Sequence, residues 1–230
     1  MSTTLAPRIS VQAPSPESLE ADYGGVKHAL DTASDFQSLV GAVERWDALR
    51  RRLRTWRALV HLRFRQDTRD EQARADRARA DELEPQILAR DAEIKRRLLE
   101  RPDADSLRQR YGSQAFRLWQ ADLESYDSAI DADLVEESRL QSEYTSLFGG
   151  ISVEFGGRRL TLPEVRGYLN HADRELRHAA ERARWSAIGA HGEQLDRLYA
   201  DLVTVRDRIG RTLGEDGFVP VAYARMHRVD

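Results

Sequence analysis

The fold is decided by the stretch SDFQSLVGAVERWDALRRRLRTWRALV, which spans residues 34–60. Apolar residues recur in it every seven positions, and a second apolar series lies three positions further on: Leu39, Trp46, Leu53 and Val60, then Ala42, Leu49 and Trp56. A heptad pattern with two apolar positions predicts a helix that packs along one seam, here over about thirty residues. Ser34 or Asp35 is the expected N-cap.

The residues that follow predict a second helix, antiparallel to the first. Residues 66–70 are polar and compatible with a turn, and apolar residues then return at the same spacing: Ala73, Ala80, Ile87 and Ile94. Pro85 lies inside this run and is expected to kink or divide it. The helix should stop near Pro102, because the residue before a proline avoids the helical region. Two such helices joined by a short turn predict a long hairpin.

The second half of the chain carries a strand signal. Residues 151–155 alternate apolar and polar, glycines 156–157 supply a two-residue turn, and residues 158–162 alternate again. This pattern predicts a β-hairpin. Thr161 and Glu164 then have the spacing of a capping box at the start of a helix.

The remaining periodicity predicts further helices, of which the last is the longest. Apolar residues at three- and four-residue steps from Asp173 to Ile209 predict one helix of roughly forty residues, which Gly189 and Gly192 could bend. The expected fold class is therefore mainly α: a long antiparallel helical hairpin plus a helical bundle, with one small β-hairpin near residues 151–162.

Three parts are expected along the chain. Residues 1–33 contain several prolines and glycines and little periodicity, which predicts an extended lead-in segment. Residues 34–132 hold the helical hairpin and the helices that follow it. Residues 133–230 hold a helix, the β-hairpin and the long helix.

Composition excludes several functional classes. Of the 230 residues, 33% are charged and none is cysteine, which excludes disulfides, thiolate zinc sites and cysteine nucleophiles. No apolar run is long enough to span a membrane, and the first sixteen residues lack the pattern of a signal peptide. A soluble, cytoplasmic protein is expected. The basic residues are all arginine except Lys27 and Lys95, and biased base composition is the favoured explanation.

Catalytic and metal-binding motifs are absent from the 230 residues. A helical zinc site needs the string H-E-x-x-H, which does not occur. His171, Glu175 and His178 could share one helix face, but the two histidines are about 10 Å apart along the axis, too far to share one ion. His191 lies on the apolar stripe of the last helix and is expected in the core. His28, His61 and His227 have no companions in the sequence.

Sequence motifs of other reaction classes are absent as well. There is no G-x-S-x-G elbow and no glycine-rich phosphate loop. The adjacent pair Glu136 and Glu137 has nothing that marks it as an acid–base couple. No catalytic, cofactor-binding or metal-binding residue is therefore assigned to this chain.

The arginine-rich first helix suggests nucleic-acid binding, with arginines on phosphates and tryptophans stacked on bases. Trp46 and Trp56 both fall on the heptad seam, however, which predicts that they are buried. The net charge of −3 also disfavours such a function. The arginines are expected to pair with the acidic residues of the second helix, which are Asp76, Asp81, Glu82, Glu84, Asp91 and Glu93.

Several segments of the second half resemble one enzyme family. They are LVEESRLQSEYTSL (residues 134–147), ISVEFGGRRLTL (151–162), DRELRHAAERARW (173–185), LGEDGF (213–218) and YARMHRVD (223–230). In pattern and order they are similar to the oligoendopeptidase F branch of the thimet-oligopeptidase-like zinc metallopeptidases. The similarity extends over roughly residues 34–230.

The resemblance implies a function for the chain as part of a larger enzyme. In that family this region is the N-terminal helical part, which includes a projecting hairpin and forms one wall of a channel that admits short peptides. The zinc ligands and catalytic groups come from the C-terminal part, so the resemblance implies zinc in the full-length enzyme and none bound by this segment. The expected partners are short peptides and the missing C-terminal catalytic part, with no nucleic acid and no membrane.

The end of the sequence at Asp230, within an amphipathic stretch, is expected to reflect a truncated chain, a split gene or a remnant of a pseudo-enzyme. The alternative hypothesis is a helical interaction or scaffold protein that uses residues 34–99 to bind a partner helix.

Overall fold

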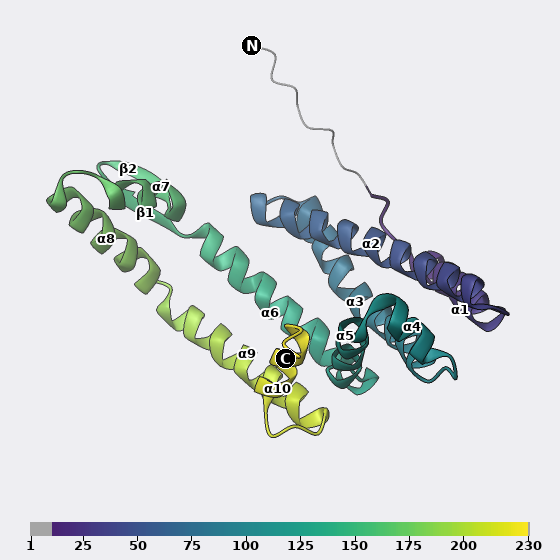
Figure 1. The fold of residues 1–230 in the computed structure, drawn as a ribbon. Helices are drawn as coiled ribbons and strands as arrows, with labels where there is room; N and C mark the ends of the chain where they lie inside the picture. Colours follow the sequence, from purple (N-terminus) through teal and green to yellow (C-terminus); the bar gives the residue numbers. More distant parts are fainter. Residues whose placement is uncertain (1–10, 230) are drawn as a thin grey trace, which may run out of the picture.

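The computed structural model describes residues 11–229, and its architecture is mainly α, as predicted (Figure 1). The α-helices are α1 (Pro16–Asp31), α2 (Phe36–Gln66), α3 (Glu71–Leu99), α4 (Ala104–Tyr111), α5 (Ser113–Glu124), α6 (Asp131–Gly150), α7 (Leu162–Arg166), α8 (Arg174–Gly189), α9 (Gly192–Thr212) and α10 (Phe218–Arg225). Short 3₁₀ turns occupy Ser128–Ile130 and Gly167–Asn170, and the two strands are β1 (Ser152–Phe155) and β2 (Arg158–Thr161).

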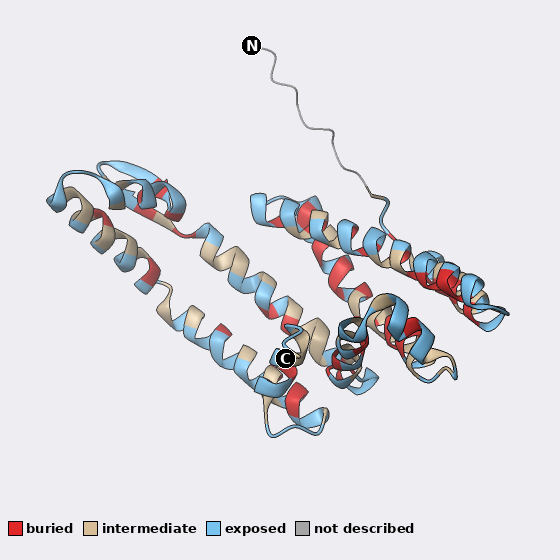
Figure 2. Cartoon of the chain, in the orientation of Figure 1, coloured by how far each residue is buried: buried red, intermediate tan, exposed pale blue. Residues whose placement is uncertain are grey.

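The predicted hairpin of long helices is confirmed in α2 and α3. Asp35 is the N-cap of α2, with its carboxylate accepting a hydrogen bond from the Ser38 amide at 2.7 Å. Asp70 caps α3 in the same way, accepting from the Ala73 amide at 3.0 Å. The apolar seam that the heptads predicted is buried along α2, and along α3 it is buried except at Ile87, which is partly buried; Figure 2 shows the buried residues in red.

Pro85 does not divide the second helix, contrary to one of the two outcomes predicted for it. Helix α3 runs without interruption from Glu71 to Leu99 with Pro85 buried inside it. A proline in a helix removes one backbone hydrogen bond. The burial of neighbouring apolar residues, including Leu83 and Ile94, offsets that loss, because each fully buried side chain of this size contributes about 1.5–3 kcal/mol.

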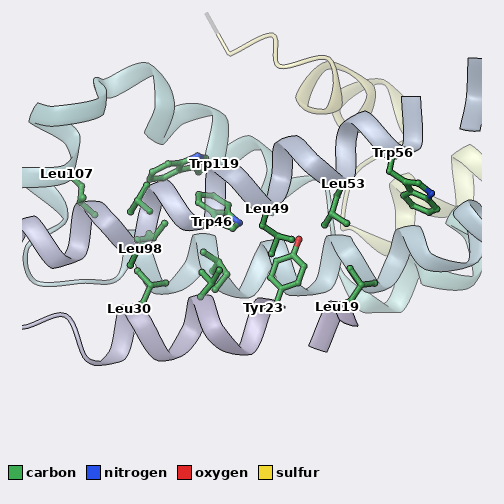
Figure 3. Packing of buried hydrophobic residues seen from close by; sticks show 14 of the residues in the cluster. Leu19, Tyr23, Leu30, Trp46, Leu49, Leu53, Trp56, Leu98, Leu107 and Trp119 are labelled. Atoms are coloured by element: carbon green, nitrogen blue, oxygen red, sulfur yellow. The ribbon is translucent and has the colours of Figure 1, made fainter. Parts of the chain in front are cut away.

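The prediction of an extended lead-in is wrong for residues 16–31, which form α1. Ser15 and Ser18 make a capping box and Pro16 occupies the first turn, where its fixed φ favours a helix. One face of α1 is buried on the hairpin through Leu19, Tyr23, Val26 and Leu30. Figure 3 shows Leu19, Tyr23 and Leu30 among these residues, with α1 lying along the α2–α3 pair. Residues 1–10 of the predicted lead-in lie outside the described residues.

The apolar side of the α2–α3 hairpin is therefore covered by other helices of the same chain. Helix α1 covers one side of it, and Phe116 and Trp119 of α5 join the same core on another side. The Trp119 ring lies 5.6 Å from the Trp46 ring in an edge-on arrangement. The scaffold hypothesis placed a partner helix on residues 34–99. In the structure, α1 and α5 of the same chain occupy that apolar surface.

The β-hairpin forms where it was predicted. Strands β1 and β2 pair antiparallel with Val153 opposite Leu160. The turn residues Gly156 and Gly157 have φ angles of 60° and 71°, which glycine adopts without strain. The capping box of Thr161 and Glu164 starts α7. An isolated two-stranded hairpin is marginal in water, and this one is stabilised by packing on α7 and α8.

The single long helix predicted near the C-terminus is instead two helices. Helix α8 ends at Gly189 and α9 begins at Gly192, so the chain breaks at the two glycines that were expected only to bend it. Helix α9 packs along α6 to form a long arm, with the β-hairpin and α8 at its far end (Figure 1). Helix α10 folds back between α9 and α5.

Three apolar clusters hold these elements together. The first lies between helices α1 to α5, the second between α3, α6, α9 and α10, and the third under the β-hairpin. Ala92 of α3 belongs to the second cluster, so α3 connects the hairpin with the arm. The division at residues 33 and 132 stays a prediction.

Candidate functional site

The candidate site is the junction between the helical hairpin and the arm. An open pocket of about 520 Å³ lies there, lined by residues of α2, α3, α5, α6 and α10. Its wall carries three acidic and three basic side chains beside an apolar surface: Glu84, Asp122 and Glu137, and Arg57, Lys95 and Arg225. Burying charges is costly unless they are paired, so their partners decide what the junction can do.

Asp91 of α3 is the centre of the first group of paired charges. Its Oδ1 accepts hydrogen bonds from the Tyr23 hydroxyl and from Trp46 Nε1, each at 2.8 Å. Its Oδ2 lies 3.3 Å from Arg50 Nε and 3.7 Å from Lys95 Nζ. Burial and the neighbouring Asp91 charge raise the pKa of Tyr23, so its hydroxyl keeps its proton and remains a donor. One carboxylate thus joins α1, α2 and α3.

Lys95 connects the Asp91 group with Asp122 of α5 and, through Asp122, with the end of α10. Its ammonium is buried and lies 3.0 Å from Asp122 of α5, and the other oxygen of Asp122 lies 2.9 Å from His227 Nε2. Burial acts to raise the pKa of Asp122, but Lys95 and the hydrogen bond with His227 outweigh it and lower that pKa. Asp122 is therefore a carboxylate that ties the end of α10 to α5.

Glu137 of α6 is the second buried carboxylate. It accepts hydrogen bonds from Arg206 Nε of α9 at 2.7 Å and from Arg225 Nη1 of α10 at 3.1 Å. The two guanidinium groups lie 5.5 Å and 5.4 Å from the centre of the Phe218 ring. Three helices of the arm are thus joined through one carboxylate.

A third group lies between α2, α3 and α6. Arg57 pairs with Glu84, and burial raises the pKa of Glu84 against the opposing effect of Arg57. Arg77 donates to Asp81 and to the Ser138 hydroxyl of α6, both at 2.9 Å. The charged groups of the junction are thus used in pairing helices with one another, which suits a rigid joint.

His61 of α2 lies beside this group and gives a pH-dependent test. Burial, with the nearby Arg77 and Arg57, lowers the pKa of His61 to about 4. In the unfolded chain, His61 binds a proton near pH 6.5, its ordinary pKa, whereas the folded protein binds that proton only near pH 4. The free energy of unfolding is therefore highest above pH 6.5 and decreases as the pH falls toward 4. Because the ring is half-exposed, we expect the loss to be only about 1–2 kcal/mol.

Urea unfolding at pH 7 and pH 4.5 measures this effect. The His61→Gln variant should lose less stability than the wild type between the two pH values, by about that amount. An identical loss in both proteins would contradict the assignment.

The histidines considered for metal binding do not form a site. His171 and His178 are exposed, as is Glu175, and His171 Nδ1 accepts a hydrogen bond from the Asp173 amide at 3.1 Å. Among residues 11–229, no group of three His, Asp or Glu side chains could hold a metal ion. The described part of the segment therefore offers no set of side chains that fits a zinc ion. His191 is also not in the core, because the break between α8 and α9 leaves it half-exposed.

Sequence reasoning missed the two residues that matter most at the junction. His227 has no companion close to it in the sequence, and the fold brings it to Asp122 from 105 residues away. Glu137 was considered only as one of an adjacent carboxylate pair. Gln141 follows Glu137 by four residues and donates a hydrogen bond to it. This local contact does not indicate that Glu137 is buried between Arg206 and Arg225.

The arginine-rich helix behaves as predicted in its main features. Trp46 and Trp56 are buried, and Arg50 and Arg57 pair with Asp91 and Glu84 of α3. Arg52 differs, because it pairs with Asp22 of α1, a helix that was not predicted. Within residues 11–229, no helix combines the length and the apolar character that crossing a membrane requires.

Comparison with known proteins identifies the family. Residues 8–126, just over half of the chain, match the family model of the peptidase M3 N-terminal domain. The chain belongs to the peptidase M3 family. Its resemblance to the oligoendopeptidase F branch is thereby confirmed. None of the curated proteins compared with this M3 chain matches it.

Solved structures from the same family share the fold. The M3 chain superimposes on an assigned oligoendopeptidase F from Bacillus anthracis str. Ames with a TM-score of 0.90 and 28% identity. It matches Pz peptidase A, solved with an inhibitor, with a TM-score of 0.91 and 31% identity, and another assigned oligoendopeptidase F with 0.91 and 33%. Each match covers 96% of this chain but only 41%, 40% and 39% of the other. The chain thus spans about two fifths of their length.

Proposed function

We propose that this chain is the N-terminal wall, or lid, of the substrate channel in a zinc-dependent oligopeptidase that hydrolyses short peptides in the cytoplasm. The observation that carries the proposal is the structural match: 96% of the chain superimposes on two fifths of proteins named as oligoendopeptidase F or Pz peptidase. The missing H-E-x-x-H string supports a non-catalytic role for the segment itself.

The contacts that fix the helices of this segment relative to one another support this role. A channel wall must hold its shape while peptides enter and leave. The α2–α3 hairpin is stiffened by α1 on one side and by the Asp91 group inside, and the arm is fixed by Glu137. In Figure 1 the hairpin lies beside the arm: α3 packs along α6, and a Cβ on Gly149, near the end of α6, would lie 3.7 Å from Thr68 Oγ1 in the turn of the hairpin.

The proposed enzyme binds its zinc outside this chain. Residues 11–229 supply no ligand set, so they are assigned no step of peptide hydrolysis. Its proposed partners are the C-terminal catalytic part of an M3 peptidase and the short peptides admitted to the channel. Its proposed place is at the start of such an enzyme, with residues 133–230 leading into the catalytic part.

An activity assay on the isolated chain tests the non-catalytic part of this proposal. With zinc and a quenched fluorescent peptide, we expect no turnover above that of buffer with zinc, because no metal site or nucleophile is assigned within the segment. A known M3 peptidase in the same assay is the positive control. Cleavage that a chelator abolishes would contradict the proposal.

A further inference from the structure

Helix α9 carries a second face beside the one that packs on α6, and its N-terminal half is apolar and exposed at Tyr199 and Val203. Tyr199, Val203, Arg206 and Gly210 follow one another at steps of four, three and four residues, which places them on one side of the helix. The face toward α6 is different and is formed by Leu198, Val205 and Ile209, all buried. The two faces meet at an angle of roughly 90–130°, from the helical rotation of 100° per residue.

The C-terminal half of this second face is covered by α10. The approach is close: a Cβ on Gly210 would lie 2.3 Å from the carbonyl oxygen of Gly217. Phe218 of α10 lies against Arg206, as described above for the junction. The N-terminal half of the same face is bare, with Tyr199 71% exposed and Val203 49% exposed. The contact with α10 therefore stops partway along this side of α9, and the two exposed apolar residues Tyr199 and Val203 lie beyond it.

Helix α10 also has an outer apolar face. Val219, Tyr223 and Met226 follow at steps of four and three residues, and they are 68%, 48% and 52% exposed. Nine large apolar side chains are exposed in the described residues, and five of them lie between residues 199 and 226. Single exposed apolar residues need no explanation, but a concentration of them marks a contact surface.

We propose that these five residues, the α9–α10 face, dock against the C-terminal part of an M3 peptidase. The proposal rests on the proposed function and specifies where the two parts of that enzyme meet. Two observations select this occupant. The face continues an intrachain interface, and about three fifths of each matched structure lies outside the part that this segment covers. Aromatic and aliphatic residues dominate the centres of permanent interfaces of this kind.

Thiol labelling tests the docking face without background, because the chain contains no cysteine. Two single-cysteine variants are needed: Tyr199→Cys on the face, and Leu62→Cys as the control, at a 52%-exposed position on α2. Each is labelled with a maleimide reagent twice. The first sample is the isolated chain, and the second is a chimera in which the chain is joined to a cysteine-free C-terminal part of the Bacillus anthracis oligoendopeptidase F.

Both thiols should react readily in the isolated chain. In the chimera, we expect labelling at position 199 to slow by about tenfold or more, because thiol reactivity depends on exposure, and labelling at position 62 to stay unchanged. Equal rates at position 199 in both samples would overturn the docking face. Protection in the isolated chain that grows with its concentration would also overturn it, since a second copy would then be the occupant.

The activity of the same chimera separates this inference from the function on which it rests. An active chimera with an unprotected position 199 would refute the docking face and leave the proposed function standing. A protected position 199 in a folded but inactive chimera would support the face and count against the channel function.

Discussion

Replacing Asp91 with leucine should lower the free energy of unfolding by about 3–5 kcal/mol, as removal of one member of a buried charge group does. The carboxylate receives the Tyr23 hydroxyl and Trp46 Nε1, and it neutralises Arg50. Without it, two buried donors lose their acceptor, which costs about 1–3 kcal/mol each, and the largely buried Arg50 guanidinium loses its opposite charge. Domains of this kind are stable by only about 5–15 kcal/mol, so the loss is large.

Urea unfolding followed by circular dichroism measures this change. Glu82→Leu is the matched control, because Glu82 is an exposed acidic residue on the same helix, and it should change stability by less than about 0.5 kcal/mol. Asp91→Asn keeps the volume and one acceptor and should fall between the two. Equal stability of Asp91→Leu and Glu82→Leu would show that the Asp91 group does not hold α1, α2 and α3 together.

The second large effect is expected at Gly210, where α9 and α10 touch. An alanine Cβ there would lie 2.3 Å from the Gly217 carbonyl oxygen and 2.8 Å from the Phe218 amide nitrogen, both backbone atoms. Backbone cannot move aside as a flexible side chain can, so α10 must shift away from α9. We expect Gly210→Ala to destabilise the chain by about 1–3 kcal/mol through overpacking.

The control for Gly210 predicts the opposite sign. Gly41 lies within α2, and a Cβ there would meet nothing within 4 Å. Gly41→Ala should therefore stabilise the chain by about 0.5–1 kcal/mol, the usual gain in a helix interior. Urea unfolding of both variants decides the matter, and a stabilised Gly210→Ala would contradict the close packing of α10 on α9.

Local sequence patterns predicted the elements whose stability is mostly local. The heptads of α2 and α3, the cap at Asp35 and the glycine turn of the β-hairpin all depend on residues close together in sequence. Helix α1 was missed because Pro14, Pro16 and two glycines outweighed its apolar stripe. The signal was present, since Ser15 followed by Pro16 is a typical helix start.

The junction could not be predicted, because its contacts join distant residues. Asp91 meets Trp46 across 45 residues and Tyr23 across 68, and Glu137 meets Arg225 across 88. In a chain with 33% charged residues, nothing in the sequence distinguishes these carboxylates from those on the surface. The prediction of one continuous helix in place of α8 and α9 was wrong for a related reason. Gly189 and Gly192 permit either a bend or a break, and tertiary packing decides between them.

The central claim is that this chain works as the N-terminal part of an M3 peptidase, and exchanging it into a relative tests that claim most directly. In the measurement, the chain replaces the matching N-terminal two fifths of the Bacillus anthracis oligoendopeptidase F, and cleavage of a quenched fluorescent peptide is followed with zinc present. We predict that the chimera cleaves the peptide at least about tenfold faster than the C-terminal part alone, because a formed channel positions the substrate. A chimera that folds, with a single cooperative unfolding transition, but is no faster than the C-terminal part alone would contradict the account.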